Sequence, residues 1–146
     1  MAGFYTGELH KELFIDTMNI FVFGSNEAGR HGAGAAKFAR EGIGYPYYEY
    51  DGQIGNAYAL PTKDAWIGTL PIEAISKYVL KFLNHAHANQ QYTYYVTPIG
   101  CGLAGYKHED IAPLFIKGLQ LPNLVFCEEW KVIYESMYNG QKEMQG

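Results

Sequence analysis

Short apolar runs alternate along the chain with segments in which apolar residues recur at helical spacing. Residues 19–23 include four consecutive apolar positions and predict a strand buried on both faces. Residues 69–84 place apolar side chains at every third or fourth position, which predicts a helix with one face toward a core. Because strands and helices alternate, we expect an α/β protein with a mixed, mostly parallel central sheet. The same patterns predict further strands at 57–60, 92–97 and 124–127 and further helices at 33–41, 110–119 and 128–138.

Three further stretches are less regular. Residues 13–15 predict a short strand. Residues 45–55 contain a proline and two glycines, and four of the first six residues are tyrosines. This composition predicts a packed surface loop. Residues 139–146 predict a flexible tail. A length of 146 residues is that of one ordinary domain, so we expect a single domain over 1–146.

Glycine-rich loops follow two of the predicted strands. The first loop, 24–34, leads into a helix, and the second, 98–106, follows the strand 92–97. Backbone N–H groups at a helix start favour an anion, and glycine lets a phosphate approach the backbone. A tight connection without a ligand also explains the first loop, whose spacing fits neither the dinucleotide fingerprint nor the Gly-Lys-Ser/Thr phosphate loop. If both loops leave one edge of the sheet, they form two walls of a cleft whose backbone donors favour a diphosphate.

Four side chains in these loops are candidates for chemistry. Asn26 can hydrogen-bond a ribose hydroxyl, and Tyr106 can stack on a sugar or base. His31 is either an acid or base, or only a hydrogen bonder within the loop. Cys101 is a candidate nucleophile, but its neighbours supply no base, so a small residue filling a tight loop is the favoured interpretation.

Charge and composition narrow the function further. The net charge is −4 and no basic stripe stands out, which argues against a dedicated nucleic-acid surface. Cys101 and Cys127 show neither metal-ligand spacing nor a disulfide framework, and His85 and His87 complement a helix dipole, so we expect no metal and no cofactor. The sequence shows no signal-peptide pattern and no apolar run long enough to span a bilayer, so we expect a cytoplasmic protein without a membrane partner.

The two loops and the strand ends beside them resemble the macrodomains, a family that binds ADP-ribose. The resemblance is closest to the terminal ADP-ribose glycohydrolase branch, which has runs similar to residues 31–36, 62–63 and 99–103 in the same order. It covers roughly residues 19–120. The chain also looks like phage and bacterial proteins with the pattern Gly-Ser-Asn…Gly-Arg-His-Gly-Ala-Gly, and a phage-encoded protein would act in the host cytoplasm. The resemblance implies a three-layer α/β/α macrodomain-like fold.

The resemblance also implies a ligand and a site. It predicts that ADP-ribose, or a related NAD-derived nucleotide diphosphate, binds between the loops. The ligand is either free or attached to an ADP-ribosylated protein or nucleic acid. In the branch the lysine after the threonine attacks the ribose carbon, and Lys63 occupies its position. The implied catalytic residues are Lys63, Asn26 and His31. The implied ligand-binding residues are Ser25, Gly32, Ala33, Gly34, Thr62, Ile99, Gly100, Cys101, Gly102, Leu103, Ala104, Gly105 and Tyr106.

Ala104 occupies the position of the acidic residue that completes the chemistry in that branch, and alanine cannot transfer a proton. Three functions therefore stay open: an ADP-ribosyl hydrolase, a non-catalytic module that binds or sequesters an ADP-ribose-like signal, and an interaction domain that uses its tyrosine-rich loop. Asp64 is a candidate substitute acid, although neighbouring side chains on an extended segment point to opposite faces. Glu8 and Asp16 are candidates for the acidic residue that holds adenine in many macrodomains.

Overall fold

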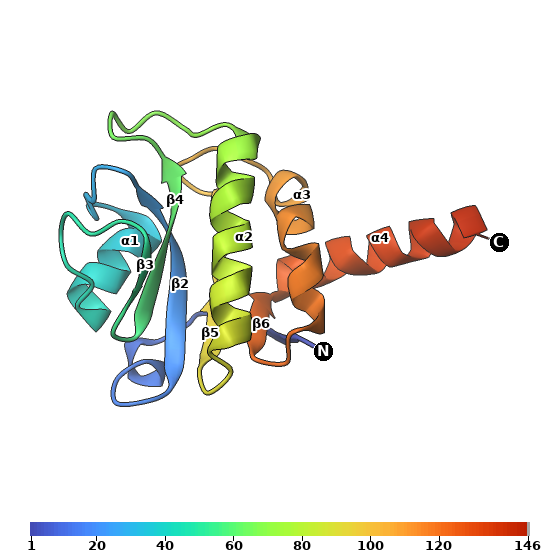
Figure 1. Ribbon diagram of the computed structural model, residues 1–146, viewed down its shortest axis with the longest axis horizontal. Coiled ribbons are helices and arrows are strands. Elements are labelled where there is room, and N and C mark those ends of the chain that lie inside the picture. Colours follow the sequence, from blue (N-terminus) through green and yellow to red (C-terminus); the bar gives the residue numbers. More distant parts are fainter. Residues whose placement is uncertain (146) are drawn as a thin grey trace.

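The computed structural model describes residues 1–145, with side chains for residues 1–140. The described residues form a six-stranded sheet with the order β1-β6-β5-β2-β4-β3 (Figure 1). Its strands are β1 (Gly3–Tyr5), β2 (Asn19–Asn26), β3 (Gly52–Ile54), β4 (Ala57–Lys63), β5 (Thr93–Val96) and β6 (Leu124–Cys127). The α-helices are α1 (Gly34–Phe38), α2 (Ile72–Ala88), α3 (His108–Ile111) and α4 (Glu128–Gln145); 3₁₀ helices span η1 (Lys11–Leu13) and η3 (Ala112–Gln120), and a π-helix spans η2 (Ala39–Ile43).

Neighbouring strands of the sheet run parallel, except for β3 and β4, which are antiparallel. This arrangement confirms the predicted mixed, mostly parallel sheet. Parallel neighbours require crossover connections, and helical segments supply most of them here. The antiparallel pair needs only a short turn, and Gly55 and Asn56 provide it between β3 and β4.

Helical segments cover both faces of the sheet. Successive residues of β2 point to opposite faces, so this strand contributes to the core on each side. Ile20 and Val22 face a core formed with α2, η3 and α4, whereas Phe21 and Phe23 face a second core formed with α1. All four side chains are buried, as the uninterrupted apolar run predicts. Helices therefore lie on both sides of the sheet, which confirms the three-layer α/β/α architecture.

Most predicted elements are present, with shifted ends. The predicted helix 33–41 is the short helix α1 continued by the π-helix η2. The predicted helix 110–119 is α3 followed by η3, with Pro113 at the start of η3, where its missing N–H costs no hydrogen bond. Helix α2 begins at Ile72, after Pro71, rather than at residue 69.

Local predictions are wrong in three places. The predicted strand 13–15 lies at the end of η1 and in the following turn, where Asn19 Nδ2 donates a hydrogen bond to Leu13 O (3.0 Å). The predicted strand 57–60 ends too early, because the pairing of β4 with β2 continues past Pro61 to Lys63. The predicted loop 45–55 ends in the edge strand β3, and β1 has no counterpart among the predicted elements.

Helix α4 starts directly after β6 and projects away from the sheet (Figure 1). Trp130 and Tyr134 are buried in the core and anchor its first two turns. The predicted helix 128–138 is confirmed, and the backbone stays helical to Gln145. The tail expected over 139–146 falls largely on residues whose side chains lie outside the described part.

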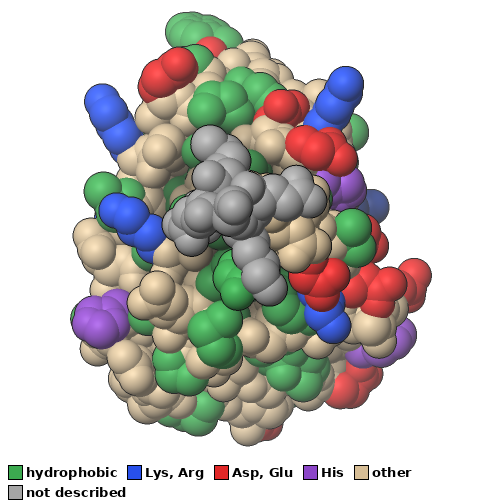
Figure 2. All heavy atoms as spheres, turned by 90° about the vertical axis from the view of Figure 1, so that its right-hand side faces the viewer, with side chains coloured by type: hydrophobic (Ala, Val, Ile, Leu, Met, Phe, Trp, Pro, Cys, Tyr) green, Lys and Arg blue, Asp and Glu red, His purple; other side chains and the backbone are tan. Residues whose placement is uncertain are grey.

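Figure 2 shows the face from which α4 projects. Lys and Arg side chains are interspersed there with Asp and Glu, and the described part of this face carries no continuous basic stripe. Over the described residues, none of the helices combines the length and the apolar character needed to cross a membrane.

Candidate functional site

The two glycine-rich loops enclose a cleft of about 630 Å³. They leave the carboxyl ends of β2 and β5, which are parallel neighbours, so both loops lie at the same edge of the sheet. The ends of β4 and β6 also border the cleft. The predicted residues that line it are Ser25, Asn26, Gly32, Ala33, Gly34, Thr62, Lys63, Ile99, Gly100, Cys101, Gly102, Leu103 and Ala104.

The first wall of the cleft is the segment that leads into α1. The first hydrogen bond of this helical turn runs from Lys37 N–H to Ala33 O (3.2 Å). The N–H groups of Gly32, Ala33 and Gly34 therefore have no acceptor among the described residues. The wall offers backbone donors rather than side chains, which suits an anionic ligand.

The second wall is the loop 98–106, which internal turn hydrogen bonds hold in shape. These bonds leave the N–H groups of Gly102, Leu103 and Ala104 without an acceptor in the described part of the chain. Gly100 has a φ of 77°, and a Cβ there would lie 3.1 Å from an isoleucine side chain of α3, so the turn requires glycine. Unpaired backbone donors thus border the cleft from both sides.

The tyrosine loop, residues 45–50, packs behind the first wall. Ser25 Oγ donates a hydrogen bond to Tyr50 O (2.6 Å), and Tyr48 N–H donates one to Gly29 O (2.9 Å). Tyr48 is 79% exposed, and a partner contact through this loop, one of the three open functions, stays a hypothesis. The first glycine-rich loop and the tyrosine loop therefore form one packed unit, because their backbones are in contact.

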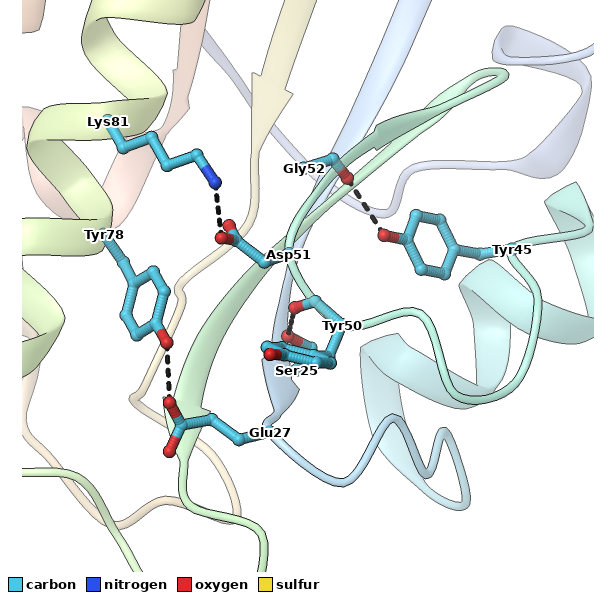
Figure 3. A network of polar contacts seen from close by, with 8 residues as sticks. All are labelled: Ser25, Glu27, Tyr45, Tyr50, Asp51, Gly52, Tyr78 and Lys81. Carbon is cyan, nitrogen blue, oxygen red and sulfur yellow. Dashed lines mark hydrogen bonds and ion pairs between the residues drawn. The ribbon is translucent and has the colours of Figure 1, made fainter.

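Figure 3 shows how this unit is fastened to α2. Tyr78 of α2 donates a hydrogen bond to Glu27 Oε2 (2.6 Å), and Lys81 forms an ion pair with Asp51 (2.5 Å). Burial, and then the Glu27 carboxylate, raise the pKa of the Tyr78 hydroxyl, so this group stays a donor at neutral pH.

Lys63 and Asn26 lie at the paired ends of β4 and β2, and both line the cleft. Asn26 Nδ2 donates to Arg30 O (2.6 Å), and Asn26 Oδ1 accepts from Arg30 N–H (3.0 Å). The Asn26 amide therefore closes the start of the first loop and keeps one N–H for a ligand.

The structure does not bring Asp64, the candidate substitute acid, to the cleft. Its Oδ1 accepts hydrogen bonds from the N–H groups of Trp66 (2.8 Å) and Gly68 (2.9 Å), so the carboxylate caps its own turn.

The structure places His31 away from the cleft, behind its first wall. Its side chain is fully buried, and Nε2 lies 3.1 Å from Pro46 O and 2.9 Å from Glu49 O. Both partners are acceptors, so Nε2 carries the proton and donates to the tyrosine loop. The ring packs edge-on against Phe23 and Tyr45. Of the two interpretations of His31, these contacts support the hydrogen bonder within the loop.

Gly105 and Tyr106 are also not brought to the cleft. Tyr106 OH donates a hydrogen bond to Leu70 O (2.7 Å), and its ring packs against the core. This tyrosine therefore ties the second wall to the start of α2 instead of offering a stacking surface.

Cys101 lines the cleft as a protonated thiol. Burial raises its pKa to about 11, and the nearby Asp110 and Glu109 add to the shift. Sγ lies 3.4 Å from Ile99 O, to which it donates. A thiol with a raised pKa is a poor nucleophile, which supports the interpretation of Cys101 as a small loop residue.

Several residues that line the cleft were not among the site residues predicted from the sequence. Arg30 and Lys63 make the side near β2 and β4 cationic, whereas Glu129 follows β6 and is the acidic side chain among the described lining residues. The rule that ligand contacts follow the carboxyl ends of parallel strands could have found Glu129. The additional lining residues are Gly24, Arg30, Ala35, Ala36, Ile67, Thr97, Pro98, His108 and Glu129.

A second hollow of about 370 Å³ adjoins the cleft and shares Gly34, Ala35 and Thr97 with it. Glu8 lines this hollow, whereas Asp16 does not. Of the two candidates for holding adenine, the structure brings Glu8 next to the cleft. Within the described residues, no group of three or more His, Cys, Asp or Glu side chains is placed to hold a metal ion.

No protein-family model matches the chain, and no curated protein matches it. Solved structures do match. The macrodomain of Thermus aquaticus DarG is similar with a TM-score of 0.62 and 18% identity, over 87% of this chain and 97% of that chain. The macrodomain of Mycobacterium tuberculosis DarG is similar with a TM-score of 0.60 and 18% identity, over the same shares of each chain. The chain has a macrodomain fold.

A third similar structure is that of Thermosipho africanus DarTG in complex with ADP-ribose, with a TM-score of 0.57 and 16% identity. The match covers 76% of this chain and 38% of that chain. The macrodomain fold expected from the two loops is thus confirmed.

Proposed function

We propose that the chain binds ADP-ribose, or a related NAD-derived nucleotide diphosphate, in the cleft between its glycine-rich loops. The observation that carries this proposal is the set of unpaired N–H groups, contributed by both walls at the carboxyl edge of the sheet. A diphosphate suits such walls because its oxygens accept hydrogen bonds from main-chain donors. A cleft of about 630 Å³ has the size of a small-molecule site. The ADP-ribose complex of a similarly folded protein supports the proposal.

The charges around the cleft suggest the direction in which the ligand lies. Arg30 and Lys63 border the side near β2 and β4, whereas Glu129 and Glu8 lie toward β6 and β1. A carboxylate accepts a hydrogen bond from the amino group of adenine. We therefore place adenine in the second hollow, beside Glu8, and the distal ribose near Lys63.

Titration calorimetry with ADP-ribose tests this proposal. We expect a Kd well below about 1 mM, which corresponds to about −4 kcal/mol, and weaker binding would contradict it. Gly102→Glu places a carboxylate beside the unpaired N–H groups, in open space without atoms within 4 Å of the new Cβ. We expect this variant to bind at least about tenfold more weakly, because like charges repel. Gly102→Gln has the same shape without the charge and is the matched control.

Removal of ADP-ribose from a modified target is the second candidate function, and Lys63 supports it. A lysine amine at the distal ribose could attack the ribose carbon and displace the carrier, whose leaving atom would then need a proton. Ala104 supplies none, and the Asp64 carboxylate is held within its own turn. Glu129 follows β6, three strand spacings or about 14 Å from β4. These observations favour binding without turnover.

Incubation with ADP-ribosylated protein and with ADP-ribosylated DNA distinguishes the two functions. For a non-catalytic binder, we expect no more free ADP-ribose by chromatography than with the Lys63→Arg variant. Release by the natural chain that the variant lacks would instead establish a hydrolase.

A further inference from the structure

Two polar side chains at the β6 end of the cleft have no ligand group assigned to them in the binding mode proposed above. His108 begins α3, and Glu129 lies in the first turn of α4, and both line the cleft. They come from different elements, yet both adjoin Trp130, which follows Glu129 in the chain and hydrogen-bonds His108. They therefore occupy one end of the cleft, beyond the two glycine-rich walls.

The hydrogen bond from Trp130 fixes the proton of His108. Trp130 Nε1 lies 3.1 Å from His108 Nδ1, and an indole N–H can only donate. His108 Nδ1 must accept, so the neutral ring carries its proton on Nε2. Trp130 is fully buried, which holds the donor in place. His108 thus offers one N–H donor from a ring of fixed tautomer.

Glu129 supplies the complementary group. Its carboxylate accepts hydrogen bonds, and within the described lining of the cleft it has no acidic neighbour. The cationic lining residues Arg30 and Lys63 lie toward β2 and β4, separated from β6 by β5. An anionic substituent bound at the β6 end would therefore meet a negative charge with no lining cation to offset it.

A donor and an acceptor at the same end of the cleft match two adjacent hydroxyls, one of which donates while the other accepts. In the ligand direction proposed above, the sugar between the diphosphate and adenine lies at this end. We propose that Glu129 and His108 bind the 2′- and 3′-hydroxyls of that ribose and make the site select ADP-ribose over its 2′-phosphorylated form. This inference rests on the proposed binding of ADP-ribose. A 2′-phosphate would lose the hydroxyl donor and face the carboxylate.

An acidic residue in the first turn of a helix also stabilises the helix, whether or not it touches a ligand. The neighbouring Glu128 separates these two roles, because it shares the first turn of α4 but does not line the cleft. Glu128→Gln is therefore the matched control for Glu129→Gln.

The test is titration of the full chain and both variants with ADP-ribose and with ADP-ribose 2′-phosphate. We expect the natural chain and Glu128→Gln to bind ADP-ribose at least about tenfold more tightly than the 2′-phosphate. In Glu129→Gln we expect this ratio to fall to within about threefold, mainly because the 2′-phosphate binds better. Unfolding midpoints measured alongside show whether each variant is folded.

A second measurement uses the 2′-deoxy analogue of ADP-ribose, altered at the adenosine sugar. Loss of the hydroxyl should weaken binding about tenfold in the natural chain and have little effect in Glu129→Gln. Tight binding of ADP-ribose without discrimination, or an unchanged ratio in Glu129→Gln, would overturn the assignment of this end while the proposed function stands. Failure of the natural chain to bind ADP-ribose at all would overturn both.

Discussion

At the scale of single residues, the cleft depends on main-chain groups, and several side chains that were candidates for chemistry are held in local hydrogen bonds. Asn26 uses both ends of its amide to close the first loop. His31 faces the tyrosine loop, and Cys101 is a half-buried thiol with a raised pKa. The polar atoms offered to a ligand are therefore largely backbone N–H groups, with Lys63 and Glu129 near opposite ends.

The Cys101 thiol gives a prediction that depends on pH. Its pKa is raised to about 11, so little thiolate exists at pH 8, and iodoacetamide should label Cys101 far more slowly than an unfolded cysteine. Labelling measured by mass spectrometry should accelerate as the pH approaches 11. Because the unfolded thiol ionises first, near pH 9, this group favours the folded state below pH 9, and its contribution is lost as the pH rises through 11. Rapid labelling at pH 8 would contradict the raised pKa of this thiol.

The two glycine-rich loops could be predicted from the sequence as the walls of the candidate site, but the directions of their side chains could not. A loop has no helical or strand period, so neighbouring residues give no information about which way His31 points. Its direction is set by carbonyl groups of the tyrosine loop, 15 and 18 residues later in the chain. The role of a glycine is easier to predict than that of a side chain, because glycine acts through its own backbone.

At the scale of elements, the first wall and the tyrosine loop form one unit. Gly29 is the point of closest approach, since a Cβ there would lie 2.3 Å from Tyr48 Cα. Ser25 and His31 add hydrogen bonds on either side of this contact. The unit holds the unpaired N–H groups of the first wall in place before a ligand arrives, which lowers the ordering cost of binding.

Replacing Gly29 with alanine should therefore destabilise the protein. Gly29 has a φ of 69°, where a side chain costs about 1–2 kcal/mol, and the new methyl group would overlap the Tyr48 backbone. We expect the free energy of unfolding to fall by at least about 2 kcal/mol in urea titrations. Gly32→Ala is the control, because no atom lies within 4 Å of its added Cβ. Equal losses in the two variants would show that the contact with Tyr48 is unimportant.

The elements that escaped prediction from sequence are the short ones. Strands β1 and β3 have three residues each and lie at the two edges of the sheet, where one side pairs with a neighbour and the other does not. Three residues cannot establish an alternating pattern. In β4, Pro61 resembled a strand end, but pairing with β2 overrides this local signal. The longer periodic segments, such as α2, were predictable because their packing repeats.

At the scale of the whole molecule, the cleft joins strand ends that are distant in sequence. Its lining runs from Gly24, near the end of β2, to Glu129, after β6. The parallel order of β4, β2, β5 and β6 brings these ends to one edge of the sheet. That order explains why a candidate site could be predicted from the loops that follow the strands. It also explains why predicting Glu129 as a lining residue would have required knowing which strand lies beside β5.

Trp130 links this edge to the core and gives the prediction at this scale. It packs against Phe115 and Phe126 and hydrogen-bonds His108. We expect Trp130→Phe to lower the free energy of unfolding by about 1–3 kcal/mol and to weaken selection against the 2′-phosphate, because His108 loses its fixed tautomer. Urea unfolding and calorimetry measure the two effects. In Trp66→Phe, at a side chain that is 91% exposed, a change above about 0.5 kcal/mol would be unexpected.

The pairing of β1 with β6 bears on how the chain folds during synthesis. Strand β1 is made before the other strands of the sheet, yet its partner β6 ends at Cys127. At about 5–20 residues per second, β1 leaves the ribosome roughly 6–25 s before β6 is complete. Until then β5 also has an open edge, because β6 lies between it and β1. The nascent chain must therefore keep two strand edges from pairing with other molecules, and a chaperone that shields extended segments would find its targets there.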